Sequence, residues 1–272
     1  MLLTAISIAG SFKNLHDMIT EPKRHTVFDF DLSNPDSSTY KHHLLSVINS
    51  CAMSKNSELV ITEKMKAIFD RPPFDSLWDS KEERENLIDC FHKQLRIHNT
   101  NQLEMGEHTF ENLPDQKFWY SKTIGSGLCP FSSLFNHSCD SNVKRFTVDN
   151  KIAFVVGRPI KAGEQLFISY GYSSYRMSRD ERRKQLQRFS FNCDCQACVK
   201  NFPQIVQLVK IDKRFVEPKF DEVTRTFEGV EIFKKNCEYI EKNIVHHPCM
   251  ETTTLMIHNE HLLHQISRMK IE

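Results

Sequence analysis

Two stretches of the sequence concentrate the side chains that could bind a metal or act in catalysis. The first, Leu134 to Asn142 (LFNHSCDSN), places an amide, an imidazole, a hydroxyl, a thiol and a carboxylate at consecutive positions. The second, Cys193 to Cys198 (CDCQAC), holds three thiols. We expect these two stretches to meet in space and to share one metal ion.

The spacing of Cys193, Cys195 and Cys198 is typical of a zinc site. Thiols this close in sequence are poor disulfide partners for one another, whereas they suit a tetrahedral thiolate site. A structural zinc ion usually has a fourth Cys or His ligand. We favour Cys139, because polar residues surround it and place it near the start of a strand. The alternative is that Cys139 is a small buried residue and that the fourth ligand is His137 or an isolated cysteine.

The pair Asn136-His137 could also be interpreted as a catalytic base beside an amide. A single histidine is more often structural than catalytic, and sequence spacing cannot establish a Ser-His-Asp arrangement. The residues by themselves therefore predict a mixed α/β domain with a thiolate zinc site and a polar cluster at the end of a strand.

The composition is that of a soluble globular chain. Of 272 residues, 39% are hydrophobic and 26% charged, which is enough for a sizeable core. The net charge of +1 gives no electrostatic reason to expect a nucleic-acid partner, and no apolar run is long enough to span a membrane. The eight glycines form no phosphate-binding motif. Nine cysteines, three of them crowded together, indicate metal binding and reduced thiols, and hence a cytoplasmic and/or nuclear location.

Helices are expected in the N-terminal part, up to about residue 99. Apolar residues recur at helical spacing over Tyr40 to Ala52 and Ser57 to Phe69. The pattern Ser80-x-x-Glu83 fits a capping box that starts a further helix. Asn99 to Asn101 should form a loop, and Gly125-x-Gly127 a backbone bend.

Strands are expected around the polar stretch, followed by helices. Val143 to Val148 and Ile152 to Val156 are rich in β-formers and flank a polar turn, which predicts a hairpin. Gln165 to Tyr170 predicts a third strand. A capping box at Ser178 predicts a short basic helix through Arg188 with a solvated face, and Val230 to Ile244 has the spacing of a C-terminal helix.

Three segments together resemble the SET domain and the post-SET cysteine motif of protein-lysine methyltransferases: LFNHSCDSN, GEQLFISYG and RRKQLQRFSFNCDCQAC. The helices before the first and after the third are similar to the SET and MYND-domain (SMYD) branch, and YSSYRM (Tyr172 to Met177) resembles its SMYD4-like members. The resemblance implies an α+β fold: a SET-type β fold of short strands with a pseudoknot, a helical insertion, a post-SET zinc site and C-terminal helices.

The resemblance also divides the chain into four segments. They are a helical SET insertion region (1–99), the C-terminal core of the SET domain (100–175), a post-SET zinc-binding segment (176–200) and a truncated helical C-terminal region (201–272). The sequence does not show the cysteine-rich MYND module, nor the glycine-rich N-terminal SET segment that contacts the cofactor. On this basis the chain is expected to be the C-terminal portion of a family member.

Residue roles follow from the resemblance as well. Asn136 and His137 would contact S-adenosylmethionine. Tyr170 would be the active-site tyrosine and would line the cofactor site, and Phe191 would be an aromatic wall near the cofactor or the lysine channel. A structural zinc ion would be bound by Cys139, Cys193, Cys195 and Cys198. Phe189 stands where the family often has a second tyrosine, so one hydroxyl is lost there.

The function implied is S-adenosylmethionine-dependent methylation of a lysine in a histone or non-histone protein. This reaction needs a neutral amine in line with a sulfonium methyl, and a tyrosine hydroxyl and aromatic faces can position both. The alternative is a catalytically impaired, zinc-stabilised protein-interaction module derived from a SET enzyme. A DNA-binding zinc protein is a third hypothesis, disfavoured by the near-neutral charge. The sequence predicts neither the particular substrate nor the oligomeric state.

Overall fold

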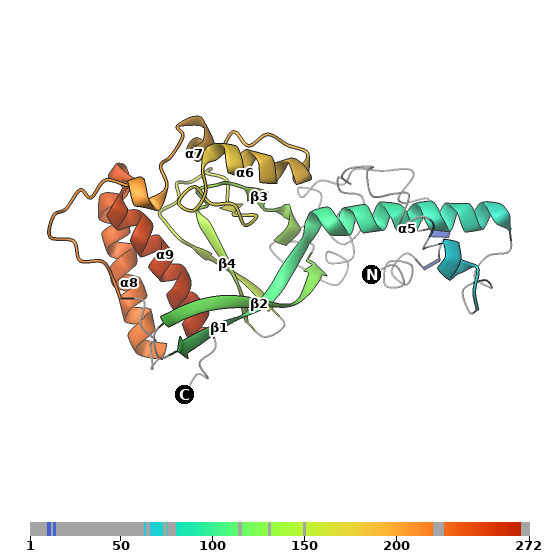
Figure 1. Cartoon of the computed structure of the whole chain (residues 1–272), viewed down its shortest axis with the longest axis horizontal. Coiled ribbons are helices and arrows are strands. Elements are labelled where there is room, and N and C mark those ends of the chain that lie inside the picture. The colour runs from blue at the N-terminus through green and yellow to red at the C-terminus, as the bar shows by residue number, and fades with distance from the viewer. Residues whose placement is uncertain are drawn as a thin grey trace. The chain divides into compact units, whose positions relative to one another are not determined.

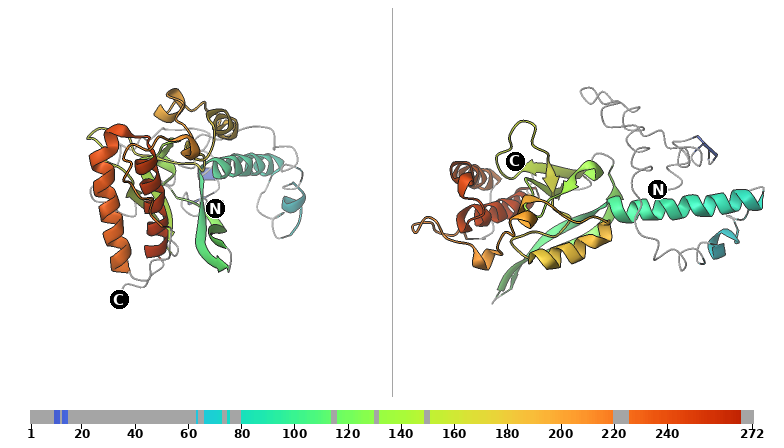
Figure 2. Two further views of the ribbon diagram at one scale, coloured as in Figure 1. Left: turned by 60° about the vertical axis from the view of Figure 1, so that its left-hand side comes forward. Right: turned by 90° about the horizontal axis from the view of Figure 1, so that it is seen from above.

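The structure is a computed structural model that describes residues 10–11, 13–14, 63, 66–72, 75, 80–113, 116–129, 132–148, 151–219 and 226–267 (Figure 1, Figure 2). The helix expected at Tyr40 to Ala52 lies outside these residues. Of the helix expected at Ser57 to Phe69, residues 63 and 66–69 are described and are helical. The chain divides into two compact units. The first comprises Met1–Leu103, Gly127–Leu134 and Arg188–Ser190, and the second comprises Glu104–Ser126, Phe135–Gln187 and Phe191–Glu272.

In the first unit, the helix α5 (Lys81–Asn101) begins where its sequence predicts. The hydroxyl of Ser80 accepts a hydrogen bond from the backbone N–H of Glu83 at 3.1 Å, which satisfies one free donor of the first turn. Leu87 and Ile88 bury their side chains with Phe69 in a small apolar cluster. The apolar face of the helix is therefore what anchors it in this unit.

The loop expected at Asn99 to Asn101 is wrong, because α5 continues through these residues. The side-chain amide of Asn101 donates to the carbonyl of Ile97 at 2.9 Å, and the carbonyl of Asn101 accepts from the Ser133 hydroxyl at 3.0 Å. Ser133 belongs to the short 3₁₀ helix η4 (Ser132–Leu134). One contact within the helix and one from a residue 32 positions away thus hold Asn101 in a helix that its local preference would end.

The strands β1 (Gln102–Leu113) and β2 (Gln116–Leu128) pair in a two-stranded sheet that belongs mainly to the second unit. The sequence does not predict these strands. The bend expected at Gly125-x-Gly127 is wrong, since both glycines lie within β2. Pairing with a neighbouring strand satisfies the backbone here and overrides the weak local tendency of glycine to bend.

A second sheet consists of the predicted hairpin. The strands β4 (Val143–Val148) and β5 (Lys151–Val156) are antiparallel, in a register that runs from Val143 opposite Val156 to Val148 opposite Lys151. Phe154 of β5 stacks on Phe135 with ring centroids 4.5 Å apart. The hairpin therefore packs against the residue that leads into the polar stretch.

A third sheet joins the polar stretch to the segment that ends at Tyr170. The strand β3 (Asn136–His137) pairs in parallel with β6 (Phe167–Ile168), so the strand expected at Gln165 to Tyr170 is confirmed for its central residues only. The fully buried side chain of Asn142 completes the junction. Its amide donates to the Gln165 carbonyl at 2.9 Å, and its oxygen accepts from the Phe167 N–H at 2.7 Å.

The helix α6 (Arg179–Leu186) begins with the predicted capping box. The hydroxyl of Ser178 accepts from the Glu181 N–H at 3.4 Å, and the Glu181 carboxylate accepts from the Ser178 N–H at 2.9 Å. The helix ends at Leu186, earlier than predicted, and the 3₁₀ helix η5 (Gln187–Phe189) follows it. A one-turn helix, α7 (Gln196–Val199), contains the last cysteine of the motif.

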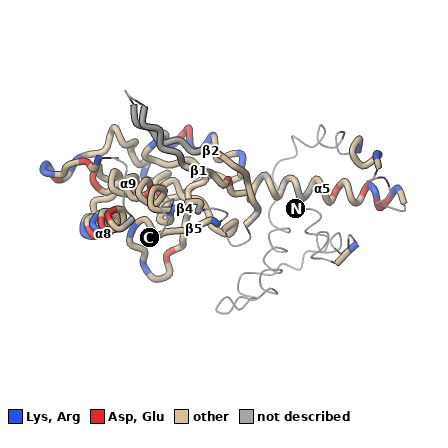
Figure 3. Tube along the Cα trace, turned by 90° about the horizontal axis from the view of Figure 1, so that it is seen from below, with Lys and Arg blue, Asp and Glu red and all other residues tan. Residues whose placement is uncertain are grey.

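The C-terminal region is helical, as predicted. The helices α8 (Thr226–Asn243) and α9 (Met250–Ile266) lie side by side in Figures 1 and 2, and Ile240 is buried between them with Leu255 and Met256. Figure 3 shows charges of both signs along α8. Two short 3₁₀ helices flank them in the chain: η6 (Ile205–Gln207) precedes α8, and η7 (Ile244–His246) lies between α8 and α9.

Among the described residues, no helix has the length and apolar character that crossing a membrane requires. The predicted boundaries of the four segments stay predictions.

Candidate functional site

The cysteines predicted to bind zinc lie together in the second unit. The sulfur atoms of Cys139, Cys193, Cys195 and Cys198 all lie within 4.8 Å of one another. That of Cys139 is 3.9 Å from Cys193 and 3.6 Å from Cys198. In a tetrahedral site with zinc–sulfur bonds of about 2.3 Å the sulfurs are about 3.8 Å apart, whereas a disulfide needs about 2.05 Å. These cysteines form no disulfide, and their separations fit a metal ion.

Backbone hydrogen bonds hold the sulfurs in position. Cys139 follows β3, and its carbonyl accepts from the N–H of Ser174 at 2.9 Å. Cys195 directly precedes α7, and the N–H of Cys198 turns back to donate to the Cys195 carbonyl at 2.8 Å. The N–H of Cys139 points at the sulfur of Cys195, 3.4 Å away. Donors that point at sulfur in this way are typical of the shell around a metal–thiolate centre.

Contact between the thiols shifts their pKa values in opposite directions. Hydrogen bonds with Cys193 and Cys195, together with burial, raise the pKa of the Cys139 thiol far above its ordinary value. Hydrogen bonds from Cys139 and Cys193 lower the pKa of the Cys195 thiol far below its ordinary value. The thiols therefore oppose one another's ionisation, and a bound cation is what would allow all of them to ionise together.

The imidazole of His137 lies between this cluster and Tyr170. Its Nδ1 accepts a hydrogen bond from the backbone N–H of Tyr170 at 3.1 Å, and its Nε2 lies 3.3 Å from the sulfur of Cys139. Because Nδ1 accepts, the hydrogen of the neutral ring is on Nε2 and points at sulfur. Burial is the main reason that the pKa of His137 is lowered to about 4. His137 is therefore neutral at pH 7, and both of its nitrogens are engaged, so the geometry does not favour a general base.

The other predicted residues gather around the same ring. The centroids of Tyr170 and Phe191 lie 5.1 Å and 6.2 Å from that of His137. The Tyr170 hydroxyl donates to the Phe135 carbonyl at 2.8 Å, and burial raises the pKa of Tyr170. The side chain of Asn136, the neighbour of His137 on β3, is exposed. The structure thus brings together a neutral imidazole, a protonated phenol and an aromatic face beside the sulfur cluster.

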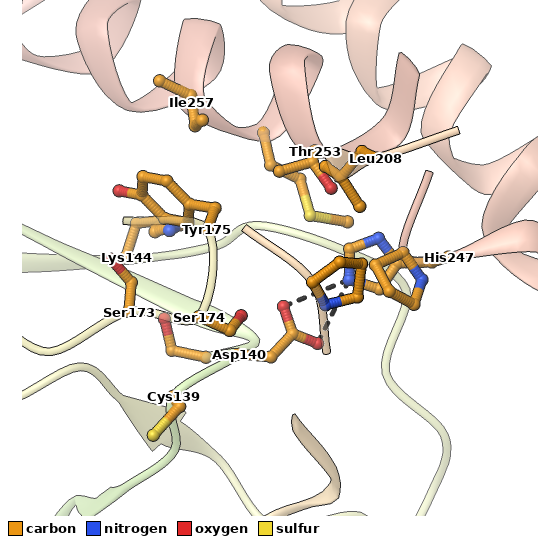
Figure 4. Close-up of a pocket in the computed structure, with 14 residues that line it drawn as sticks. Cys139, Asp140, Lys144, Ser173, Ser174, Tyr175, Leu208, His247, Thr253 and Ile257 are labelled. Atoms are coloured by element: carbon orange, nitrogen blue, oxygen red, sulfur yellow. Dashed lines mark hydrogen bonds and ion pairs between the residues drawn. The ribbon is translucent and has the colours of Figure 1, made fainter. Parts of the chain in front are cut away.

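Asp140 makes a second attachment that the sequence does not predict. Figure 4 shows its carboxylate pointing to His247, away from Cys139, and the Nε2 of His247 lies 3.1 Å from each carboxylate oxygen. The Nδ1 of His247 lies 2.9 Å from the Thr252 hydroxyl. Burial opposes ionisation of Asp140, but its hydrogen bond with His247 lowers its pKa overall. The one signal in the sequence is a carboxylate directly after a cysteine, and nothing in it identifies a partner 107 residues away.

Two cavities lie next to these residues. The smaller, about 20 Å³, is lined by Asp140, Lys144 and His247 among others (Figure 4) and has room for one water molecule. The larger, about 200 Å³, is lined by Ser169 and Gly171, the residues on either side of Tyr170. Lys144 also lines it and forms a 3.2 Å ion pair with Glu260 of α9. The larger cavity therefore reaches the backbone that carries Tyr170.

The chain belongs to the SET domain family, which matches residues 21–171. The matched range contains β3 and β6, and with them Asn136, His137, Cys139 and Tyr170. The cluster's other cysteines, Cys193 to Cys198, come after it. The family is thus established for the part of the site that surrounds His137.

The chain is similar to several SET proteins, two of which are named as lysine methyltransferases. It is 27% identical over 213 residues to SET domain-containing protein 3 of Caenorhabditis elegans. The aligned region covers 72% of this chain and 43% of that protein. It is 42% identical over 76 residues to histone-lysine N-methyltransferase SMYD3 of Mus musculus (28% of this chain, 17% of that protein). It is 32% identical over 76 residues to protein-lysine N-methyltransferase SMYD4 of Pongo abelii (28% and 10%). The chain spans less than half the length of each. These likenesses support the SET and SMYD family and, at that level, methyl transfer.

Proposed function

We propose that this chain is a SET-type protein-lysine N-methyltransferase that uses S-adenosylmethionine and belongs to the SMYD branch. The observation that carries the proposal is the pairing of β3 with β6, which gathers His137, Cys139 and Tyr170 in one site. In the proposal these segments form the pseudoknot of the SET fold. A likeness to SMYD4-like members and a cytoplasmic and/or nuclear location are parts of the proposal.

A structural zinc ion is the second part of the proposal. Cys139, Cys193, Cys195 and Cys198 would hold it, since their sulfur separations fit tetrahedral zinc. The ion would tie the segment that follows Phe191 to the end of β3. Phe191 would thereby stay beside His137, and its aromatic face would remain part of the site.

The cofactor would be held by residues on and beside β3. Bound S-adenosylmethionine would supply an activated methyl group carried on a positively charged sulfur. The exposed side chain of Asn136 can contact a ligand. Both ring nitrogens of His137 already have partners, so His137 would contact the cofactor through its backbone. The faces of Tyr170 and Phe191 suit a positively charged group. The residues present therefore fit this cofactor.

Tyr170 would orient the substrate amine through a hydrogen bond to its hydroxyl oxygen. Its raised pKa keeps the hydroxyl protonated at neutral pH. The hydroxyl donates its hydrogen to the Phe135 carbonyl, and its oxygen would accept a hydrogen bond from the amine. An amine held so is aligned for transfer without Tyr170 taking its proton.

A lysine of a protein substrate would have to reach the Tyr170 hydroxyl. The larger cavity is lined by Ser169 and Gly171 but not by Tyr170, so it marks a hollow beside this segment and not the path of the lysine. Histone and non-histone proteins both remain candidates. The proposal therefore commits to a lysine in a protein and not to a particular one.

The test is transfer of a labelled methyl group from S-adenosylmethionine to a panel of histone and non-histone proteins by the purified chain. We expect labelled lysine. Tyr170→Phe should lower the rate about 10-fold or more, because positioning of the amine is lost, and should leave the zinc content unchanged. No transfer to any protein of the panel, beside an active SMYD relative, would contradict the proposal.

A zinc-stabilised interaction module without catalysis is the second candidate. The observation that favours it is the existing hydrogen bond of the Tyr170 hydroxyl to Phe135, which a catalytic hydroxyl must share with a substrate. Calorimetric titration with S-adenosylmethionine separates the two functions. Saturable binding argues for the enzyme, and retained zinc without binding argues for the module.

A further inference from the structure

Arg182 is the largest fully buried side chain among the described residues, with 0% of its surface exposed. It lies on α6, whose sequence predicts a solvated basic face, and that prediction is wrong at this position. The following residue, Arg183, is exposed. The capping box at Ser178 and the buried Leu186 fix the rotation of the helix, and this rotation points Arg182 inward.

The buried guanidinium has sulfur where a carboxylate would be expected. Its Nη2 lies 3.7 Å from the sulfur of Cys198, and its Nη1 donates to the carbonyl of Met177. Within the described part of the chain, no carboxylate forms an ion pair with it, and its Nε has no hydrogen-bond partner. A buried charge is costly unless an opposite charge compensates it. The sulfur cluster is the group placed to do so.

Neutral thiols could not compensate this charge, because an S–H sulfur is only a weak acceptor. Thiolates around a divalent cation can, since four of them exceed its charge and leave the centre negative. The same cluster receives other N–H groups, from the ring of His137 to Cys139 and from the backbone of Cys139 to Cys195. The negative charge of a metal–thiolate centre would therefore compensate the buried positive charge of Arg182, and Arg182 would in turn stabilise the thiolates.

We propose that Arg182 is the counter-charge and positioning residue of the metal centre: it holds the Cys198 sulfur and stabilises the set of thiolates, so that the metal is released slowly. The inference rests on the zinc part of the proposed function and goes beyond it, because it assigns a role to a residue that is no ligand. Groups in this position around protein metal sites typically change metal affinity 10- to 100-fold.

The experiment compares zinc release from the purified full chain and its variants into an excess of a coloured chelator, 4-(2-pyridylazo)resorcinol. Arg182→Met should release zinc about 10-fold faster or more. Arg182→Lys, which keeps the charge and loses the planar fork, should lie between Arg182→Met and the native chain. Arg183→Met is the matched control, because it removes an equal charge from the exposed neighbour, and its release rate should equal the native one.

Cobalt substitution adds a readout that a purely structural role would not move. Loss of an N–H group pointing at sulfur makes that thiolate a better electron donor, so the sulfur-to-cobalt absorption band should move to longer wavelength in Arg182→Met and stay in place in Arg183→Met. Native release rates and an unmoved band in both Arg182 variants would overturn the inference. Should Arg182→Met fail to fold, Arg182→Lys decides: faster release supports the inference, and native release overturns it. A native chain without zinc would instead contradict the metal site itself.

Discussion

Cys139 and Asp140 are neighbours in the sequence, yet they attach the end of β3 to two different parts of the second unit. Cys139 faces the sulfurs of Cys193 to Cys198, and Asp140 faces His247, which lies between α8 and α9. The first attachment consists of sulfur atoms placed to bind a cation. The second is a half-buried hydrogen-bonded pair that needs no metal.

The cysteine segment (Cys193 to Cys198) and the helical pair α8–α9 are therefore attached to the end of β3 by independent chemistry. Removal of a thiol should release the segment that carries Phe191, and with it the aromatic wall of the site. Removal of the hydrogen-bonded pair should loosen the contact with α9 and leave the sulfurs in place. Substitutions on either side can therefore test whether the attachments act separately.

The largest effect is expected from Cys139→Ser. Zinc binding contributes about 10–16 kcal/mol in small zinc peptides, so loss of one ligand should lower the free energy of unfolding by roughly several kcal/mol. Metal analysis should find well below one zinc per chain, and denaturant unfolding should begin earlier. Cys237→Ser, outside the cluster, is the control. Unchanged zinc retention in Cys139→Ser would move the fourth ligand elsewhere, with His137 as the first alternative.

His247→Ala should come next. It leaves the half-buried Asp140 carboxylate without its partner, which should cost less than the roughly 3–5 kcal/mol typical of a fully buried pair. Urea unfolding measures the loss, and His246→Ala, at an exposed position, should be near native. Zinc content should remain that of the native chain. If His247→Ala also lost zinc, the two attachments would not be independent.

The Asp140–His247 pair also predicts how stability depends on pH. The pKa of Asp140 is held below its ordinary value of 3.8, so its carboxylate stabilises the fold above that pH and the contribution is lost as pH falls through the lowered pKa. Each unit by which folding lowers the pKa of Asp140 adds about 1.4 kcal/mol to the free energy of unfolding at neutral pH. The stability difference between the native chain and Asp140→Asn should therefore shrink between pH 5 and pH 3, measured by urea unfolding. A constant difference over this range would contradict the prediction.

The smallest effect on stability is expected from Tyr170→Phe. The substitution removes one hydrogen bond, from the hydroxyl to the Phe135 carbonyl, which is worth about 1 kcal/mol. Both attachments should persist, with native zinc content and a native response to His247→Ala. A loss of zinc in this variant would show that Tyr170 supports the metal centre as well as the substrate amine.

Local patterns predict the parts of the fold that local contacts build. The capping box at Ser178 needs only Glu181, three residues on, and it forms as expected. The hairpin of β4 and β5 likewise follows from adjacent β-rich runs. The sequence fails where a distant partner decides. Asn101 stays helical, and Gly125 lies in a strand, because groups remote in sequence satisfy their backbone or side chain.

The spacing of Cys193, Cys195 and Cys198 in the sequence is enough to identify them as metal ligands, because it limits their chemistry whatever the fold. The sequence also carried the motifs of the SET family. Only the tertiary structure placed Cys139 with those sulfurs, buried Arg182 against Cys198 and paired Asp140 with His247. Hydrogen bonds and charge compensation depend on distances of a few ångströms between groups far apart in the chain, and those distances arise only when the elements pack.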